Sequence, residues 1–189
     1  MTDVLTRSRN GEVACTAHAP PRGSLRWQVE GWQAIPAADL TPGDECLQCV
    51  LAPSVRRGDF DAVAADLRRV ASRSHSPLTV INQYIESLPL PILVADQAGN
   101  YVGANFEAYA LTGFSRKELL NCSVADLTPP ADLSDEERLW KAFVRSDGQS
   151  GVYTLRCKDG RTLRVRYDAF TNIADGFHIS FLTAPAPAS

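Results

Sequence analysis

The sequence predicts an α+β fold in residues 89–183: a five-stranded antiparallel sheet with helices over one face, preceded by a helical N-terminal extension. Two observations predict it. Residues 151–182 alternate between apolar and polar side chains, and an Asp-Gly pair ends each of the first two runs, at Gly160 and Gly176. Such alternation is typical of half-buried strands, and Asp-Gly is typical of hairpin turns. Residues 101–120 contain a strand followed by two short capped helices, a pattern that predicts a sheet with small helices between its strands.

The first half of this region reads as strand, turn, strand and two helices. Residues 91–95 are extended, and residues 96–100 form a turn in which Gly99 and Asn100 tolerate positive φ. A second strand follows at residues 101–104. Asn105 can cap a short helix with its side-chain oxygen, and Gly113 can end it in the left-handed conformation. A capping box from Ser115 to Glu118 then begins the next helix.

This arrangement resembles the PAS domain family. The resemblance rests on Asp96, Gly99, Val102, Asn105, Leu111, Gly113, Phe114, Ser115, Glu118, Leu119 and Leu120, at the spacing that they have here. With the strands that follow, it covers about half of the chain. The resemblance implies a sensory and protein-interaction module that often binds a small ligand or cofactor, and it leaves the signal open.

After residue 120, the pattern predicts a loop, one longer helix and three strands. A second capping box from Ser134 to Glu137 begins a helix that carries Leu139, Trp140 and Phe143, and residues 147–148 end it. Strands are expected at residues 151–157, 161–170 and 177–182. In the second of these, Leu163, Val165 and Tyr167 alternate with Arg164, Arg166 and Asp168, so one face is buried and the other is wet.

The last strand is expected to turn Phe177, Ile179 and Phe181 toward the core. By alternation, His178 then faces the opposite side of the sheet, away from any pocket, as a surface or interface histidine.

The residues before the sheet fall into three segments. Residues 1–24 read as a disordered tail, and residues 25–57 as an unassigned segment with a CxxC pair and a short strand near residues 25–29. Residues 58–88 form a helical linker, with one helix over residues 59–72 and another over 76–88. Residues 184–189 form a second disordered tail.

The second linker helix carries an apolar face formed by Leu78, Ile81 and Ile85. In the resembling family, a helix at this place commonly packs on the sheet or pairs two protomers. The three side chains are therefore candidates for a homodimer contact, and the alternative is that they cover the chain's own sheet.

Composition excludes several classes. The net charge of −3 offers no basic surface for nucleic acid, and no apolar run approaches the roughly 20 residues that cross a bilayer. The N-terminus lacks the apolar core of a signal peptide, so a cytoplasmic protein with reduced thiols is expected. The sequence shows no phosphate loop, nucleophile elbow or catalytic carboxylate pair, which predicts a protein that is not an enzyme.

For a small-molecule ligand, the candidate pocket residues are Trp140, Phe143, Tyr153 and Tyr167. A covalent flavin adduct is disfavoured, because alignment on residues 118–120 puts Val124 at the position that the resembling light sensors fill with cysteine, and Cys122 comes two residues early. Haem is disfavoured because residues 138–145 contain no histidine. Non-covalent flavin stays open.

The cysteines before the sheet give a second hypothesis. Cys46 and Cys49 have the spacing of half a tetrahedral zinc site, and Cys15 with His18 could supply the other half. A redox-active dithiol at Cys46 and Cys49 is the alternative, as are incidental thiols.

The sequence therefore predicts a PAS-type sensory and protein-interaction module in signal transduction, without an output domain of its own. A ligand, a redox change or a partner would shift the sheet and its flanking helices between two packings, and the linker helices would carry that shift to a partner or a second protomer. The runner-up is a zinc- or thiol-dependent redox switch or adaptor centred on Cys46 and Cys49.

Overall fold

The computed structural model describes residues 6–7, 13–14, 28, 33–36, 54–55, 57–86 and 88–183. The chain divides into two compact units, Met1–Tyr84 and Ile85–Ser189. None of the helices in these described ranges is long and apolar enough to span a bilayer.

The N-terminal unit contains short strands and two helices. Strands β1 (Thr6–Arg7), β2 (Val13–Ala14) and β3 (Gln33–Ala34) form a small antiparallel sheet in the order β2-β1-β3. Two of these strands lie within residues 1–24, where the sequence predicts a disordered tail. Gln28, the one described residue of the strand expected near residues 25–29, is helical.

Helices α3 (Phe60–Ala71) and α4 (Pro77–Ile85) lie within the two ranges that the sequence predicts. Asp59 caps α3 by accepting a hydrogen bond from the amide of Ala62. Ile81 and Ile85 of α4 are fully buried within the single chain, and Leu78 is partly buried. These side chains are thus buried in the single chain, and both the homodimer contact and the alternative, that they cover the chain's own sheet, stay predictions.

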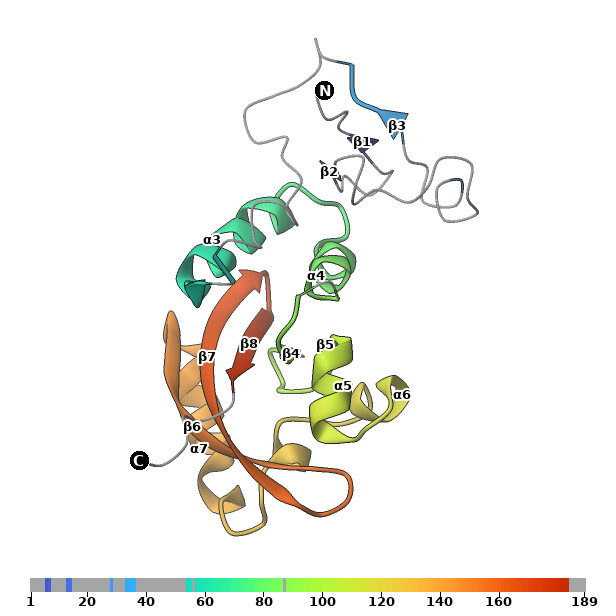
Figure 1. Ribbon diagram of the computed structural model, residues 1–189. Coiled ribbons are helices and arrows are strands. Elements are labelled where there is room, and N and C mark those ends of the chain that lie inside the picture. The colour runs from blue at the N-terminus through green and yellow to red at the C-terminus, as the bar shows by residue number, and fades with distance from the viewer. Residues whose placement is uncertain are drawn as a thin grey trace. The chain divides into compact units, whose positions relative to one another are not determined.

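The C-terminal unit is built on a five-stranded antiparallel sheet (Figure 1). Its strands are β4 (Ile92–Asp96), β5 (Tyr101–Ala104), β6 (Gly148–Arg156), β7 (Thr162–Ala174) and β8 (Phe177–Thr183), in the order β5-β4-β8-β7-β6. The five-stranded sheet predicted from the sequence is thus confirmed, with β6 beginning earlier than expected. β8 is the central strand, so both of its faces are covered by other parts of the chain, as the burial of Ile179, Phe181 and His178 shows.

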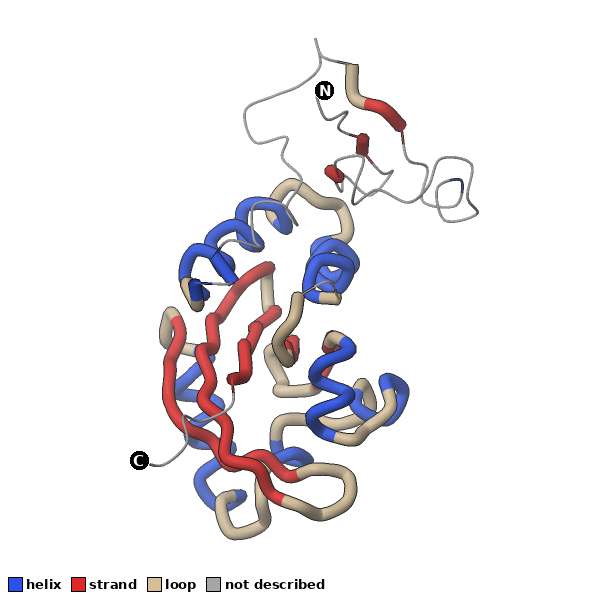
Figure 2. Tube along the Cα trace, viewed as in Figure 1, coloured by secondary structure: helices blue, strands red, loops and turns tan. Residues whose placement is uncertain are grey.

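Between β5 and β6 run the helices that cover one face of this sheet: α5 (Phe106–Thr112), α6 (Arg116–Leu119), the 3-10 turn η2 (Ala125–Leu127) and α7 (Leu133–Val144) (Figure 2). Gly113 ends α5 with φ of 76°, and Ser115 and Glu118 form the predicted capping box of α6. The capping box expected at Ser134 is wrong. The N-cap lies two residues earlier, at Asp132, whose side chain accepts no capping hydrogen bond.

Asn105 joins the start of the sheet to the chain that leaves α4. Its Oδ1 accepts hydrogen bonds from the amides of Ile92 (3.0 Å) and Ala108 (3.1 Å), the second of which is the predicted helix cap. Its Nδ2 donates to three backbone carbonyls in the connection between α4 and β4, those of Ile85 (3.0 Å), Leu88 (3.2 Å) and Leu90 (2.8 Å). One buried amide therefore holds this connection, β4 and α5 together.

Candidate functional site

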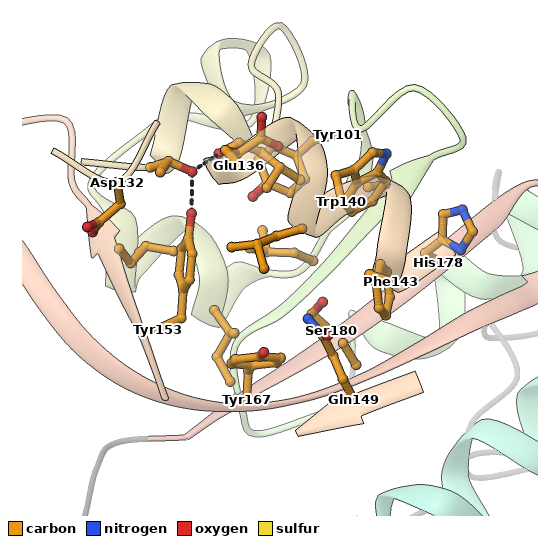
Figure 3. Close-up of a pocket in the computed structure, with 18 of the residues that line it drawn as sticks. Tyr101, Asp132, Glu136, Trp140, Phe143, Gln149, Tyr153, Tyr167, His178 and Ser180 are labelled. Carbon is orange, nitrogen blue, oxygen red and sulfur yellow. Dashed lines mark hydrogen bonds between the residues drawn. The ribbon is translucent and has the colours of Figure 1, made fainter. Parts of the chain in front are cut away.

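A cavity of about 290 Å³ lies between α7 and the sheet (Figure 3). It is lined mainly by apolar and aromatic side chains, with a few polar groups among them, which is the usual make-up of a small-molecule site. The lining residues come from β4, β5, the loop that holds η2, α7, β6, β7 and β8: Leu93, Ala95, Tyr101, Val124, Thr128, Asp132, Glu136, Leu139, Trp140, Phe143, Gln149, Val152, Tyr153, Leu155, Tyr167, Ala169, His178, Ser180 and Leu182.

The four residues proposed from the sequence, Trp140, Phe143, Tyr153 and Tyr167, all line this one cavity. The rings of Tyr153 and Tyr167 meet edge to face, with centroids 6.4 Å apart. The rings of Trp140 and Phe143 lie 5.4 Å apart on α7. The structure therefore brings these residues together, and binding of a ligand by them stays a prediction.

Trp140 fixes α7 to the turn between β4 and β5. Its Nε1 donates a hydrogen bond to the backbone carbonyl of Gln97 at 3.2 Å. The indole lies over Gly99, where an added Cβ would come within 3.4 Å of the ring. Gly99 has φ of 86°, so glycine here serves both the turn and the close approach of the ring.

His178 is the residue that the sequence places wrongly. It lines the cavity rather than the opposite face, it is only 2% exposed, and its ring meets Trp140 and Phe143 at 5.5 and 5.6 Å. Ile179 and Phe181 are fully buried on the other face of β8. The alternation is as expected, but both faces of this central strand are buried, so the face opposite Ile179 and Phe181 lines the cavity instead of facing solvent.

Both ring nitrogens of His178 contact the protein. Nδ1 accepts a hydrogen bond from the amide of Asn172 at 3.3 Å, and Nε2 lies 3.3 Å from Oε1 of Gln97. Since Nδ1 accepts, Nε2 carries the proton and donates to Gln97. Burial lowers the pKa of the imidazole, and the nearby Asp96 carboxylate opposes this only in part. His178 is thus a neutral structural group at one side of the cavity.

Three phenol groups and two carboxylates, those of Asp132 and Glu136, supply much of the polarity of the cavity. Tyr153 and Thr128 share a short hydrogen bond between their hydroxyls. Burial raises the pKa of Tyr101, and it also raises the pKa of Tyr153 and Tyr167, so all three phenols stay protonated at neutral pH. Partial burial likewise raises the pKa of Glu136, with a smaller contribution from the neighbouring Glu137.

Neither described thiol lines the cavity. Sγ of Cys122 donates to the carbonyl of Glu118 at 3.3 Å, and Sγ of Cys157 lies 3.7 Å from the carbonyl of Leu111. Burial is the largest cause of a raised pKa in both, so neither is a thiolate at neutral pH. Val124 does line the cavity, at the position that the alignment with the light sensors gives to the reactive cysteine.

The proposed zinc or redox residues, Cys15, His18, Cys46 and Cys49, lie outside the described residues.

Sequence reasoning missed several of the residues that line the cavity. Tyr101 and Glu136 follow strand and helix patterns that predict only a half-buried strand and an exposed helix face. Gln149 precedes the expected start of its strand, and Ser180 lies on the same side of β8 as His178, the side that was expected to face away from any pocket. Of these residues only Ser180 lies on the central strand, and a polar side chain at such a position is the signal that could have pointed to it.

Comparison with known proteins identifies the class. The family model for the PAS fold matches residues 81–175, which is just over half of the chain. The chain belongs to the PAS fold family, a class of sensory signalling modules, as the resemblance implies.

Among solved structures, the chain is similar to the PAS domain of a protein from Desulfitobacterium hafniense, with 14% identity and a TM-score of 0.50 over 54% of this chain and 98% of that chain. It is also similar to a domain of a sensory box sensor histidine kinase/response regulator from Geobacter sulfurreducens, with 19% identity and a TM-score of 0.49 over 55% of this chain and 90% of that chain. These likenesses concern the fold. No curated protein sequence matches the chain.

Proposed function

We propose that this PAS domain is a ligand-responsive signalling module in which a small molecule occupies the cavity between α7 and the sheet. The observation that carries the proposal is the cavity itself, about 290 Å³ in volume and lined by five Phe, Tyr and Trp rings that come from four different elements. The proposed function is binding and switching rather than catalysis.

The proposed moving part is α7. Phe143 is the one residue of this helix that is buried, and Leu139, at the cavity, is 51% exposed. Such sparse burial allows a helix to shift at low cost when the cavity fills. Val152 on β6 is 52% exposed and also lines the cavity, so the opening between α7 and β6 is the natural entry for a ligand.

Gln97 is the proposed sensor of that movement. Its carbonyl holds Trp140 of α7, and its side chain holds His178 of β8. A displacement of α7 would therefore pull on the β4–β5 turn and change the contact with β8. Asn105 at the other end of β4 and β5 binds the carbonyls that follow α4, so the change would reach the connection to α4. A partner protein or a second copy of the chain would receive it there.

Native mass spectrometry of the freshly purified chain tests the ligand and the oligomeric state together. We expect a mass above that of the sequence, removed on denaturation. Ala169→Leu should abolish the excess, because Ala169 lines the cavity and the larger side chain would fill part of it. Ala142→Leu, the same change at an exposed site on α7 that does not line the cavity, should retain it.

Circular dichroism melting must first show that both variants fold. A retained molecule that survives Ala169→Leu would place its site elsewhere. A bare monomer from the unaltered chain would count against ligand binding and in favour of a pure interaction module.

A further inference from the structure

The charge of the cavity lining restricts the ligand class. Among the described residues, no lysine or arginine belongs to the lining, whereas Asp132 and Glu136 do, and His178 is neutral. A carboxylate or phosphate group on a ligand would therefore meet acidic side chains without a cation to pair with. The lining therefore favours a neutral or cationic ligand over an anionic one.

Glu136 is the acidic residue of α7 that faces the cavity without a partner. On the same helix, Asp135 pairs with Arg138 at 3.1 Å and Glu137 pairs with Lys141 at 2.5 Å. Among the described residues, the carboxylate of Glu136 forms no hydrogen bond or ion pair, because the basic side chains of α7, Arg138 and Lys141, pair with Asp135 and Glu137 instead. A carboxylate at the cavity wall without a protein partner can accept hydrogen bonds from a ligand.

Tyr101 gives an independent observation beside it. Its side chain is 6% exposed and lines the cavity, yet within the described part of the chain its hydroxyl has no hydrogen-bond partner. Glu136 and Tyr153 both act electrostatically on this phenol. The hydroxyl oxygen is open to the cavity rather than enclosed by protein, so a ligand group there can form a hydrogen bond with it.

The remaining wall is aromatic. In the view of Figure 3, Tyr101 and Glu136 lie on one side of the cavity and Tyr167 lies on the opposite side, with Tyr153 and Trp140 to either flank. A cation close to a carboxylate and over the faces of Tyr and Trp rings gains both ion-pair and cation–π attraction, most of all where water is excluded.

We propose that the cavity binds a small organic ammonium ion, with its charged nitrogen between Glu136 and the Tyr101 hydroxyl and its apolar body against the rings of Trp140, Phe143, Tyr153 and Tyr167. This inference rests on the proposed function and adds the chemical class of its ligand. The ammonium donates hydrogen bonds to the Glu136 carboxylate and to the phenol oxygen of Tyr101.

Three probes with one aromatic body and different charges test the proposal: 2-phenylethylammonium, 2-phenylethanol and phenylacetate, each titrated calorimetrically into the full chain. We expect affinity to fall in that order. Glu136→Gln should weaken binding of the ammonium probe about tenfold, the usual effect of losing one charged hydrogen bond, and leave the alcohol unchanged. Glu137→Gln, the same change on the exposed side of α7, should alter neither.

Tyr101→Phe tests the second contact, between the ammonium and the Tyr101 hydroxyl, separately from the contact with Glu136. It removes one oxygen and keeps the ring, so it should weaken the ammonium probe while the thermal stability stays close to that of the unaltered chain. Higher affinity for phenylacetate or for the alcohol, or equal effects of the two glutamine variants, would overturn cation recognition and leave the proposed sensory function standing. Binding by none of the three probes would count against both.

Discussion

The Asn105 side chain provides the most direct test of how the domain is held to the chain that precedes it. Replacement by alanine removes five hydrogen bonds, two accepted by Oδ1 and three donated by Nδ2. An amide group has only two hydrogens, so the three carbonyls share two donors and the loss amounts to about four full bonds. At about 1 kcal/mol for each bond, the free energy of unfolding should fall by about 4 kcal/mol.

This loss is large against the roughly 5–15 kcal/mol that stabilises a typical domain. It exceeds the approximately 1 kcal/mol expected if Asn105 acted only as a helix cap. Asn105 is 1% exposed, so water cannot replace the missing amide without entering the core. Urea unfolding followed by far-ultraviolet circular dichroism measures the difference.

Two further variants sharpen this test. Asn121→Ala removes a single exposed hydrogen bond to the carbonyl of Lys117 and should cost less than about 0.5 kcal/mol. Asn105→Asp keeps the capping oxygen but turns a second oxygen toward the three carbonyls. Those carbonyls would raise the pKa of the new carboxyl above its unfolded value. The penalty is therefore present at neutral pH and is relieved as the pH falls and the carboxyl gains a proton that it can donate.

If Asn105→Ala costs no more than Asn121→Ala, or if Asn105→Asp is as stable as the unaltered chain at pH 7, the amide does not clamp this connection and the reasoning fails.

Two other predictions follow from the surroundings of Trp140. Because the pKa of His178 is lowered in the folded protein, the unfolded chain takes up a proton more readily, so the melting temperature should fall as the pH drops from 8 through about 6.5 toward 5. His178→Gln should flatten this dependence and exposed His75→Gln should not; equal slopes in the two variants would refute it. Gly99→Ala and Gly160→Ala place alanine at the same φ of 86°, but only the first meets the Trp140 indole, at 3.4 Å. Gly99→Ala should therefore lower the melting temperature more, and equal losses would mean that the indole does not rest on that turn.

The parts of the fold that follow from local rules were predictable from the sequence. The caps at Asn105, Gly113 and Ser115 depend on neighbours within a few residues, and all three occur as expected. The capping box at Ser134 failed although its motif is complete, because α7 begins at Leu133 after Asp132. Motif and geometry can differ by one or two residues at a helix end.

Properties that depend on residues far apart in the sequence could not be predicted from it. Alternation identifies β8 as a strand, but it cannot tell that β8 lies between β4 and β7 and is buried on both faces. A rule that turns apolar residues inward then assigns His178 to the wrong side. The same limit applies to Asn105. Its role as a helix cap can be predicted from the sequence, but its hydrogen bonds to carbonyls up to 20 residues away cannot.

Gln97 contacts Trp140 through its backbone and His178 through its side chain. The two contacts therefore differ in how mutation can reach them. Any residue at position 97 still offers a carbonyl to the indole, whereas the link to the imidazole depends on a side chain of the right length with an acceptor at its end. Position 97 is exposed and forms part of a turn, so it tolerates change. Variation at this single position would adjust how tightly β8 follows α7 while leaving the attachment of α7 itself constant, which makes it a point where the sensitivity of the domain can be tuned without rebuilding its core.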